Sequence, residues 1–304
     1  MRKRFSLPAI SVAASISIFI LMATPQAVRA QEDLKRIAQE STVAIYISCE
    51  QHESIHGNCN TEHLGSGVIV GRQSERYYVL TNWHVVKDQP NPYTIWTWDG
   101  KSYPLNRNNL TYIDETDLAI IEFSSQEDYR QASIYTDCFI DIKAQGDTFD
   151  EVNGYNGLEA CNTSEFSANG KPYLFVGGYS KEDTSYYDAD TIKDRPRLEF
   201  KFVAGIAREW VRNRNGNGYE LAYTNETTRR MSGGPILDSR GRLVGIHGNS
   251  EGFSVGIGIS EDIFFGSSLG IPINVFLEKI GEIFPEPSSL PQFEISNNSD
   301  VLID

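Results

Sequence analysis

The sequence is poor in basic residues, in cysteine and in histidine. Its 304 residues include 27 Lys and Arg, 41 Asp and Glu, five His and four Cys, with a formal net charge of −14 at pH 7. An acidic chain is poorly suited to bind a nucleic-acid backbone or an anionic membrane surface. After residue 30 the sequence also lacks an apolar run long enough to span a bilayer. We therefore expect neither nucleic acid nor stable membrane insertion for the mature protein.

The first thirty residues contain the longest apolar run. Three basic residues at positions 2–4 precede it, and it ends in the small-residue pattern Val28-Arg29-Ala30. This is the anatomy of a secretory signal, and we predict that residues 1–30 are removed after Ala30. An uncleaved anchor is the alternative, because the run from Phe5 to Val28 is long enough to span a bilayer. Removal would leave 23 of the 27 basic residues against 41 acidic ones, a net charge of −18, in a protein exported to the periplasm or the medium.

The four cysteines form an even set, which in an exported chain suggests two disulfides. Pairing of sequence neighbours gives Cys49–Cys59 and Cys138–Cys161. A zinc site is the alternative at the first pair, because potential ligands are closely spaced there, namely Cys49, His52, His56, Cys59 and His63. The oxidising compartment favours the disulfide. We expect no metal and no cofactor.

Most of the chain has the pattern of short strands separated by Gly, Asn, Asp and Ser. The predicted strands are 42–48, 66–71, 76–82, 93–98, 117–123, 172–179, 198–207, 219–225 and 241–248. Helical spacing of apolar residues is confined to 32–42 and 273–284. Closely spaced strands without alternating helices predict an all-β protein of antiparallel sandwiches or barrels.

The same pattern divides the chain into segments. We predict an N-terminal β domain at 31–135, a Gly- and Asn-rich connection at 136–171, and a C-terminal β domain with a closing helix at 172–284. The tail, 285–304, is polar and contains Pro and Ser, and we expect it to be disordered.

Three stretches carry residues suited to nucleophilic catalysis. "TNWHVV" contains His84, "ETDLAIIEF" contains Asp117, and "RRMSGGPILD" contains Ser232. A serine hydroxyl needs a base to take its proton, and the base needs an acid to hold its tautomer. The two glycines after Ser232 allow a tight turn that can aim backbone amides at a developing oxyanion. Each stretch is weak by itself, but the order His, Asp, Ser in an all-β chain is specific.

These stretches resemble a known family. "GSGVIV…YYVLTNWHVV", "DLAIIEF" and "MSGGPILDSRGRLVGIHG" are similar to the trypsin-like serine peptidases of the chymotrypsin fold, in their bacterial branch. The resemblance covers about residues 35–280 and implies two six-stranded antiparallel β-barrels with the active site between them. It also implies that the chain is a secreted serine endopeptidase, a monomer acting on proteins or peptides. His84, Asp117 and Ser232 would be its triad, and the amides of Arg230 and Ser232 its oxyanion hole.

Two positions depart from the family pattern. Glycine is usual two residues before the nucleophile, where φ is typically positive, but this chain has Arg230. Either Arg230 is strained, or its peptide is flipped and the oxyanion hole is incomplete, or the local turn differs. The second case favours an alternative function, a weakly active or inactive homologue that binds extended peptides. Met231 replaces the aspartate that pairs with a new N-terminus in the digestive members, so we expect no activation by that route.

The resemblance also suggests substrate contacts. An acidic Glu226 at the base of the pocket would select Arg or Lys. Alternatively, Thr227 and His247, which the glutamyl endopeptidases have at these places, would receive an acidic side chain. A core role for His247 is a further possibility. The segment Gly248, Asn249 and Ser250 is expected to pair with the substrate backbone as an added strand.

Overall fold

The computed structural model describes most, but not all, of the chain. The described residues are 25–47, 62–87, 93–105, 107–136, 167–168, 171–181, 198–210, 217–249 and 268–296. All four cysteines, His52, His56 and Ser250 lie outside them, so the predicted disulfides and the zinc alternative remain predictions. Most of the predicted connection 136–171 also lies outside.

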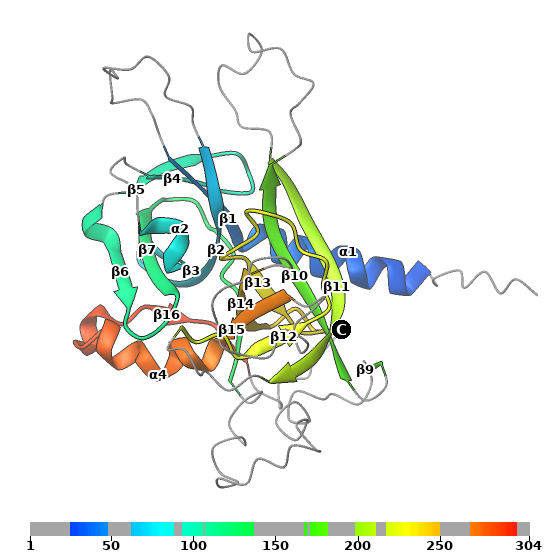
Figure 1. Cartoon of the computed structure of the whole chain (residues 1–304). Coiled ribbons are helices and arrows are strands. Elements are labelled where there is room, and N and C mark those ends of the chain that lie inside the picture. The colour runs from blue at the N-terminus through cyan, green and yellow to red at the C-terminus, as the bar shows by residue number, and fades with distance from the viewer. Residues whose placement is uncertain are drawn as a thin grey trace, which may run out of the picture.

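The N-terminal half forms a barrel-like antiparallel sheet in the strand order β5-β4-β1-β2-β3-β7-β6, with β16 added to β2 (Figure 1). Its strands are β1 (Thr42–Ile47), β2 (Glu62–Gln73), β3 (Arg76–Asn82), β4 (Tyr93–Trp96), β5 (Ser102–Leu105), β6 (Leu110–Ile113), β7 (Leu118–Ser124) and β16 (Gln292–Phe293). The described part of this sheet therefore has eight strands where the resemblance implies six. The extra ones are short, and one of them comes from the C-terminal tail.

The C-terminal half forms the second sheet. Its main strands are β10 (Lys171–Lys181), β11 (Leu198–Trp210), β12 (Leu221–Tyr223), β13 (Pro235–Leu237), β14 (Leu243–Asn249) and β15 (Ser268–Pro272). They follow one another in the order β13-β10-β11-β12-β15-β14, and β14 pairs back with β13, so six strands close into a barrel. The prediction of an all-β fold with two barrel-like sheets is confirmed.

Short strands extend the second sheet beyond its closed ring. They are β8 (Ile134–Tyr135), β9 (Ser167–Ala168) and β17 (Ile295–Ser296). β8 pairs in parallel with β14, and β17 pairs in parallel with β8. The last residues of the predicted N-terminal domain thus join the C-terminal sheet.

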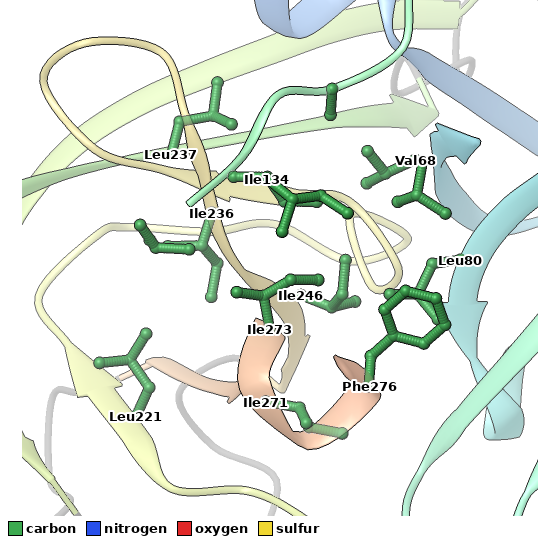
Figure 2. Close-up of a cluster of buried hydrophobic side chains, with 14 of the residues drawn as sticks. Val68, Leu80, Ile134, Leu221, Ile236, Leu237, Ile246, Ile271, Ile273 and Phe276 are labelled. Carbon is green, nitrogen blue, oxygen red and sulfur yellow. The ribbon is translucent and has the colours of Figure 1, made fainter. Parts of the chain in front are cut away.

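One hydrophobic core connects the two sheets. Figure 2 shows Val68 and Leu80, from β2 and β3, in the same cluster as Ile246 of β14 and Phe276 of the C-terminal helix. All four are fully buried. A second cluster fills the first sheet alone, around residues such as Ile45 and Val79. Because burial of apolar area is the main favourable term in folding, the shared cluster holds the two sheets together.

The helices pack at the edges of this arrangement. α1 (Pro25–Glu40) contacts β1, β10 and β11, and α4 (Ile273–Ile283) contacts β6 of the first sheet and β14 and β15 of the second (Figure 1). Short helical turns are α2 (Trp83–Val86), η1 (Arg107–Asn109) and η4 (Pro287–Ser289). α1 begins before the predicted cleavage point at Ala30. None of the helices in the described ranges is both long and apolar enough to cross a membrane.

The expectation of a disordered tail is wrong for residues 285–296. Phe293 pairs with Gly71 of β2, and its ring packs against Phe276 at 5.9 Å and Phe284 at 6.4 Å between centroids. A Cβ on Gly71 would lie 3.1 Å from the Phe293 ring, so the glycine makes room for it. The polar composition of the tail hides a few apolar residues that are sufficient to anchor it.

Candidate active site

The pairing of β3 with β7 brings His84 and Asp117 together. Asn82, the last residue of β3, lies opposite Leu118, the first residue of β7, in an antiparallel pair. The residues after β3 and before β7 therefore meet at one end of the sheet. His84 Nδ1 lies 2.6 Å from Asp117 Oδ2, and the His84 N–H donates to Asp117 Oδ1 at 2.8 Å. The side chain of His84 is 39% exposed and that of Asp117 is 14% exposed, so the imidazole is open to solvent while the carboxylate is largely covered.

Asp117 is held through its backbone as well as its side chain. Its carbonyl accepts hydrogen bonds from the Trp83 N–H at 3.0 Å and from Asn82 Nδ2 at 3.1 Å, and its own N–H donates to the Asn217 carbonyl at 2.9 Å. The Tyr219 hydroxyl donates to Oδ2 at 2.6 Å. Sequence reasoning missed Tyr219, because no motif connects it with a residue about a hundred positions earlier.

Ser232 lies in a loop between β12 and β13 that comes close to the first sheet. Gly233 has a φ of +87°, and a Cβ on it would lie 1.9 Å from the Ser66 carbonyl oxygen, so only glycine fits. The Gly233 N–H donates to the His247 carbonyl at 2.7 Å, and the His247 N–H donates to the Gly234 carbonyl at 2.9 Å. The Ser66 N–H donates to the Ser232 carbonyl at 2.8 Å. The loop is thus fixed to β14 on one side and to β2 on the other.

The Ser232 hydroxyl is half-buried and donates to the Gly248 carbonyl at 3.1 Å. Because a hydroxyl has a single hydrogen, this bond leaves none to donate to His84 in this structure. The described residues therefore give a His84–Asp117 pair in direct contact, with Ser232 on the adjoining loop in a resting orientation.

Arg230 has a φ of +77°, a region that residues other than glycine rarely adopt. Among the alternatives raised by the sequence, the backbone has the strained conformation, which costs about 1–3 kcal/mol. Ser66 Oγ donates to the Arg230 carbonyl at 3.2 Å and accepts the Tyr179 N–H at 2.9 Å. These bonds hold the peptide after Arg230. Met231 is fully buried, and its Cβ lies 2.9 Å from where a Cβ on Gly178 would be.

His247 is buried on β14, with 1% of its surface exposed. Its Nδ1 lies 2.6 Å from the Tyr223 hydroxyl. Burial, and secondarily the nearby His84, lowers the pKa of His247 to about 3. The imidazole is consequently neutral at pH 7.

The other residues considered as substrate contacts are Thr227, Glu226, Gly248 and Asn249. Thr227 Oγ1 lies 2.9 Å from Ser268 Oγ. Since the Ser268 hydroxyl donates to the Asn225 carbonyl at 2.8 Å, Thr227 is the donor in its bond to Ser268. The Glu226 side chain is exposed. Gly248 and Asn249 lie at the end of β14.

Metal ligands do not gather in the described part of the chain. No group of three or more His, Cys, Asp or Glu side chains there could hold a metal ion. His63 is in β2, but its side chain lies outside what the structure describes.

The sequence of the chain matches a known peptidase family. The sequence profile of the trypsin-like peptidase domain matches residues 65–246, which is more than half of the chain and includes His84, Asp117 and Ser232. The chain belongs to the trypsin-like peptidase family. This peptidase is accordingly a serine endopeptidase by class. No curated protein matches its sequence.

Solved structures show the same fold. The peptidase is similar to the HtrA-type protease AlgW with a decapeptide, with a TM-score of 0.51, 19% identity, and coverage of 84% of this chain and 68% of that one. A substituted form of AlgW with a decapeptide gives a TM-score of 0.50 and 18% identity, covering 84% of this chain and 67% of that one. At such identities the likeness supports the fold, and it does not extend to substrates.

Proposed function

We propose that this peptidase hydrolyses peptide bonds with a triad of Ser232, His84 and Asp117. The observation that carries the proposal is the 2.6 Å contact between His84 Nδ1 and Asp117 Oδ2, beside the loop that presents Ser232. A carboxylate at Nδ1 leaves Nε2 to act as the base and stabilises the imidazolium that forms. His84 takes the proton of Ser232 as its Oγ attacks the carbonyl carbon, and gives it to the leaving amine. Water then attacks the acyl-enzyme by the same proton-transfer steps and releases the acyl group.

The resting bond from Ser232 to Gly248 has a role in this proposal. A substrate that adds a strand beside Gly248, Asn249 and Ser250 would bring its own N–H to the Gly248 carbonyl. That carbonyl now accepts the Ser232 hydroxyl at 3.1 Å. The substrate N–H would therefore compete with the hydroxyl for this carbonyl, and the hydroxyl could turn toward His84.

The oxyanion would be stabilised by the amides of Arg230 and Ser232. The positive φ of Arg230 supports this assignment, because this is the backbone that glycine usually supplies at the position. Losing one such donor typically costs ~10²–10³ in turnover.

We further propose that the enzyme prefers acidic residues before the cut, through His247 and Thr227. The buried, neutral His247 offers a carboxylate no charge, and it offers an N–H only in the tautomer with the proton on Nε2, in which Nδ1 accepts the Tyr223 hydroxyl. Selection would then rest on hydrogen bonds, and it would be modest. The exposed position of Glu226 argues against a competing preference for Arg or Lys.

Export after removal of residues 1–30 belongs to the same proposal, since an oxidising compartment would allow the disulfides Cys49–Cys59 and Cys138–Cys161 to form. Mass spectrometry of the protein from culture fractions, before and after reduction, tests both. A mature N-terminus other than Gln31, or four free thiols, would contradict them.

A second function would follow if the strained peptide at Arg230 flipped in solution, because the oxyanion hole would then be incomplete. The protein would then bind extended peptides without cutting them. The experiment is digestion of a mixed peptide library by purified residues 31–304, with Ser232→Ala as control, read by mass spectrometry. Cleavage that is absent in the variant supports the triad, and the residue before each cut tests His247 against Glu226. Binding without cleavage would support the second function, and an organophosphorus probe that fails to label Ser232 would agree with it.

A further inference from the structure

Asp117 has a hydrogen-bond donor that the triad itself does not supply. The Tyr219 hydroxyl lies 2.6 Å from Oδ2, the same oxygen that lies 2.6 Å from His84 Nδ1. With the His84 N–H on Oδ1, the carboxylate accepts three hydrogen bonds on its two oxygens. A carboxylate held in this way has little freedom to rotate, so it presents a fixed acceptor to the imidazole.

Gly248, on β14, makes room for this tyrosine. A Cβ on Gly248 would lie 2.1 Å from the Tyr219 hydroxyl oxygen and 2.5 Å from Cε1, far inside contact distance. The two residues are therefore complementary: Gly248 has no side chain because Tyr219 fills that space. A hydroxyl carried by residue 248 would lie close to where the Tyr219 hydroxyl now lies, and it could reach the same carboxylate.

The backbone next to Tyr219 also holds Asp117. The Asn217 carbonyl accepts the Asp117 N–H at 2.9 Å. Gly218, between Asn217 and Tyr219, has a φ of +77°, which turns the chain so that both neighbours face Asp117. The segment leads into β12 of the second sheet, whereas Asp117 precedes β7 of the first. Two hydrogen bonds thus join the sheets at the triad acid.

Burial, with the charge of Asp117 and their hydrogen bond as further causes, raises the pKa of Tyr219 well above its ordinary value. The hydroxyl keeps its proton throughout the working range of a serine peptidase. It can only be the donor toward the ionised carboxylate.

We propose that Tyr219 is a positioning residue for Asp117, and through it for His84, with Gly248 as the residue that makes room for it. This inference rests on the proposed function, because it assigns Asp117 the part of the triad acid. It predicts that the hydroxyl, and not the ring, is what the reaction needs.

The test compares Tyr219→Phe with Tyr77→Phe. Tyr77 is a buried tyrosine of β3 whose hydroxyl donates to the Glu127 carbonyl at the same distance, 2.6 Å, and accepts the Tyr129 N–H at 3.2 Å, so it controls for loss of a buried, hydrogen-bonded tyrosine hydroxyl. Tyr219→Phe should lower kcat by about ten- to a hundredfold with KM nearly unchanged, since bonds to charged groups are the stronger ones. With one donor gone, the carboxylate stabilises the imidazolium more, and the acid limb of the kcat/KM profile moves to higher pH. Tyr77→Phe should change neither.

A rescue experiment separates positioning from packing. Tyr219→Ala with Gly248→Ser removes the ring and supplies a hydroxyl at the same place, whereas Tyr219→Ala with Gly248→Ala supplies only the methyl group. The serine variant should recover at least about tenfold in kcat over the alanine variant. Equal rates in the two double variants, or a Tyr219→Phe enzyme with the kcat and pH profile of the parent, would overturn the inference.

A readout without turnover keeps this inference distinct from the proposed function. In the Ser232→Ala background, the NMR signal of the proton between His84 Nδ1 and Asp117 can be followed against pH. Tyr219→Phe should raise the midpoint of its titration, and Tyr77→Phe should not. If the parent cuts no peptide but the midpoint moves, the proposed function fails and the positioning role stands. An unmoved midpoint overturns the role whether or not the parent is active.

Discussion

The backbone of Arg230 gives a prediction whose sign depends on one torsion angle. At a φ of +77° a residue with a Cβ is strained, whereas glycine is not. The guanidinium makes contacts of its own near Tyr46, so replacing Arg230 directly would mix two effects. The informative comparison is therefore Arg230→Gly with Arg230→Ala, both lacking the guanidinium and differing in the Cβ alone.

The magnitude follows from two opposing terms. A Cβ at positive φ costs about 1–2 kcal/mol. Glycine loses about 0.5–1 kcal/mol more than alanine in conformational entropy on folding. Glycine at position 230 should therefore be more stable than alanine by roughly 1 kcal/mol. With an m-value of about 3 kcal/mol/M, the urea midpoint would differ by about 0.3 M.

A matched control has the opposite expected sign. Glu286 is exposed and has a φ of −97°, where a Cβ carries no such strain. Glu286→Gly should therefore be less stable than Glu286→Ala by about 0.5–1 kcal/mol. All four proteins would be unfolded in urea in the Ser232→Ala background, which prevents self-digestion. If alanine is the more stable residue at 230 as well, φ is not positive there in solution, and the assignment of its amide to the oxyanion hole loses its support.

Three further outcomes are expected. The folded-state pKa of His247, about 3, lies below its ordinary 6.5, so the unfolded chain binds a proton first and stability falls as the pH falls. Between pH 6.5 and 4.5 the parent should lose about 2 kcal/mol of unfolding free energy that His247→Asn retains, measured in urea at both pH values; equal losses would contradict the burial. Gly233→Ala should lower the free energy of unfolding by more than about 3 kcal/mol, because its Cβ would lie 1.9 Å from a carbonyl oxygen. Gly281→Ala in α4, with open space around it, should raise the free energy of unfolding by about 0.5–1 kcal/mol in the same denaturation assay. Met231 cannot pair with a new N-terminus, so the purified mature chain should cut peptides without a lag in a continuous assay; activity that appears only after a cut at an apolar residue would disprove this.

The sequence predicts the strands best where apolar alternation is strong. β3 begins and ends where the pattern places it, at Arg76 and Asn82, and β7 differs by one residue at each end. Strands such as β5, with the sequence SYPL, were not predicted, because they are short, contain proline and pair at an edge. Their pairing depends on neighbours far away in the chain, which local pattern does not report.

The candidate site likewise combines residues that the sequence pattern identifies with one that it does not. Residue chemistry and order suggest His84 and Asp117 as partners, and the structure brings them to 2.6 Å. Tyr219 could not be found in this way, since a tyrosine after Asn-Gly in a polar segment has no distinctive spacing. Only the missing Cβ of Gly248 explains why the ring fits, and that relation exists only once β14 and the segment before β12 are folded together.

The site is held by bonds that run both ways between the sheets. Ser66 of the first sheet donates from its N–H to the Ser232 carbonyl and from its Oγ to the Arg230 carbonyl. In return, Asn217 and Tyr219 of the second half hold Asp117 of the first. The apolar cluster of Figure 2 keeps the sheets in contact, but such packing is non-directional and does not by itself fix a hydrogen-bond angle. The directional bonds beside the site do fix it, because each one fails if either sheet slides by an ångström or two. The relative position of Asp117, His84 and Ser232 is therefore set by these local bonds, and the core supplies the free energy that keeps them formed.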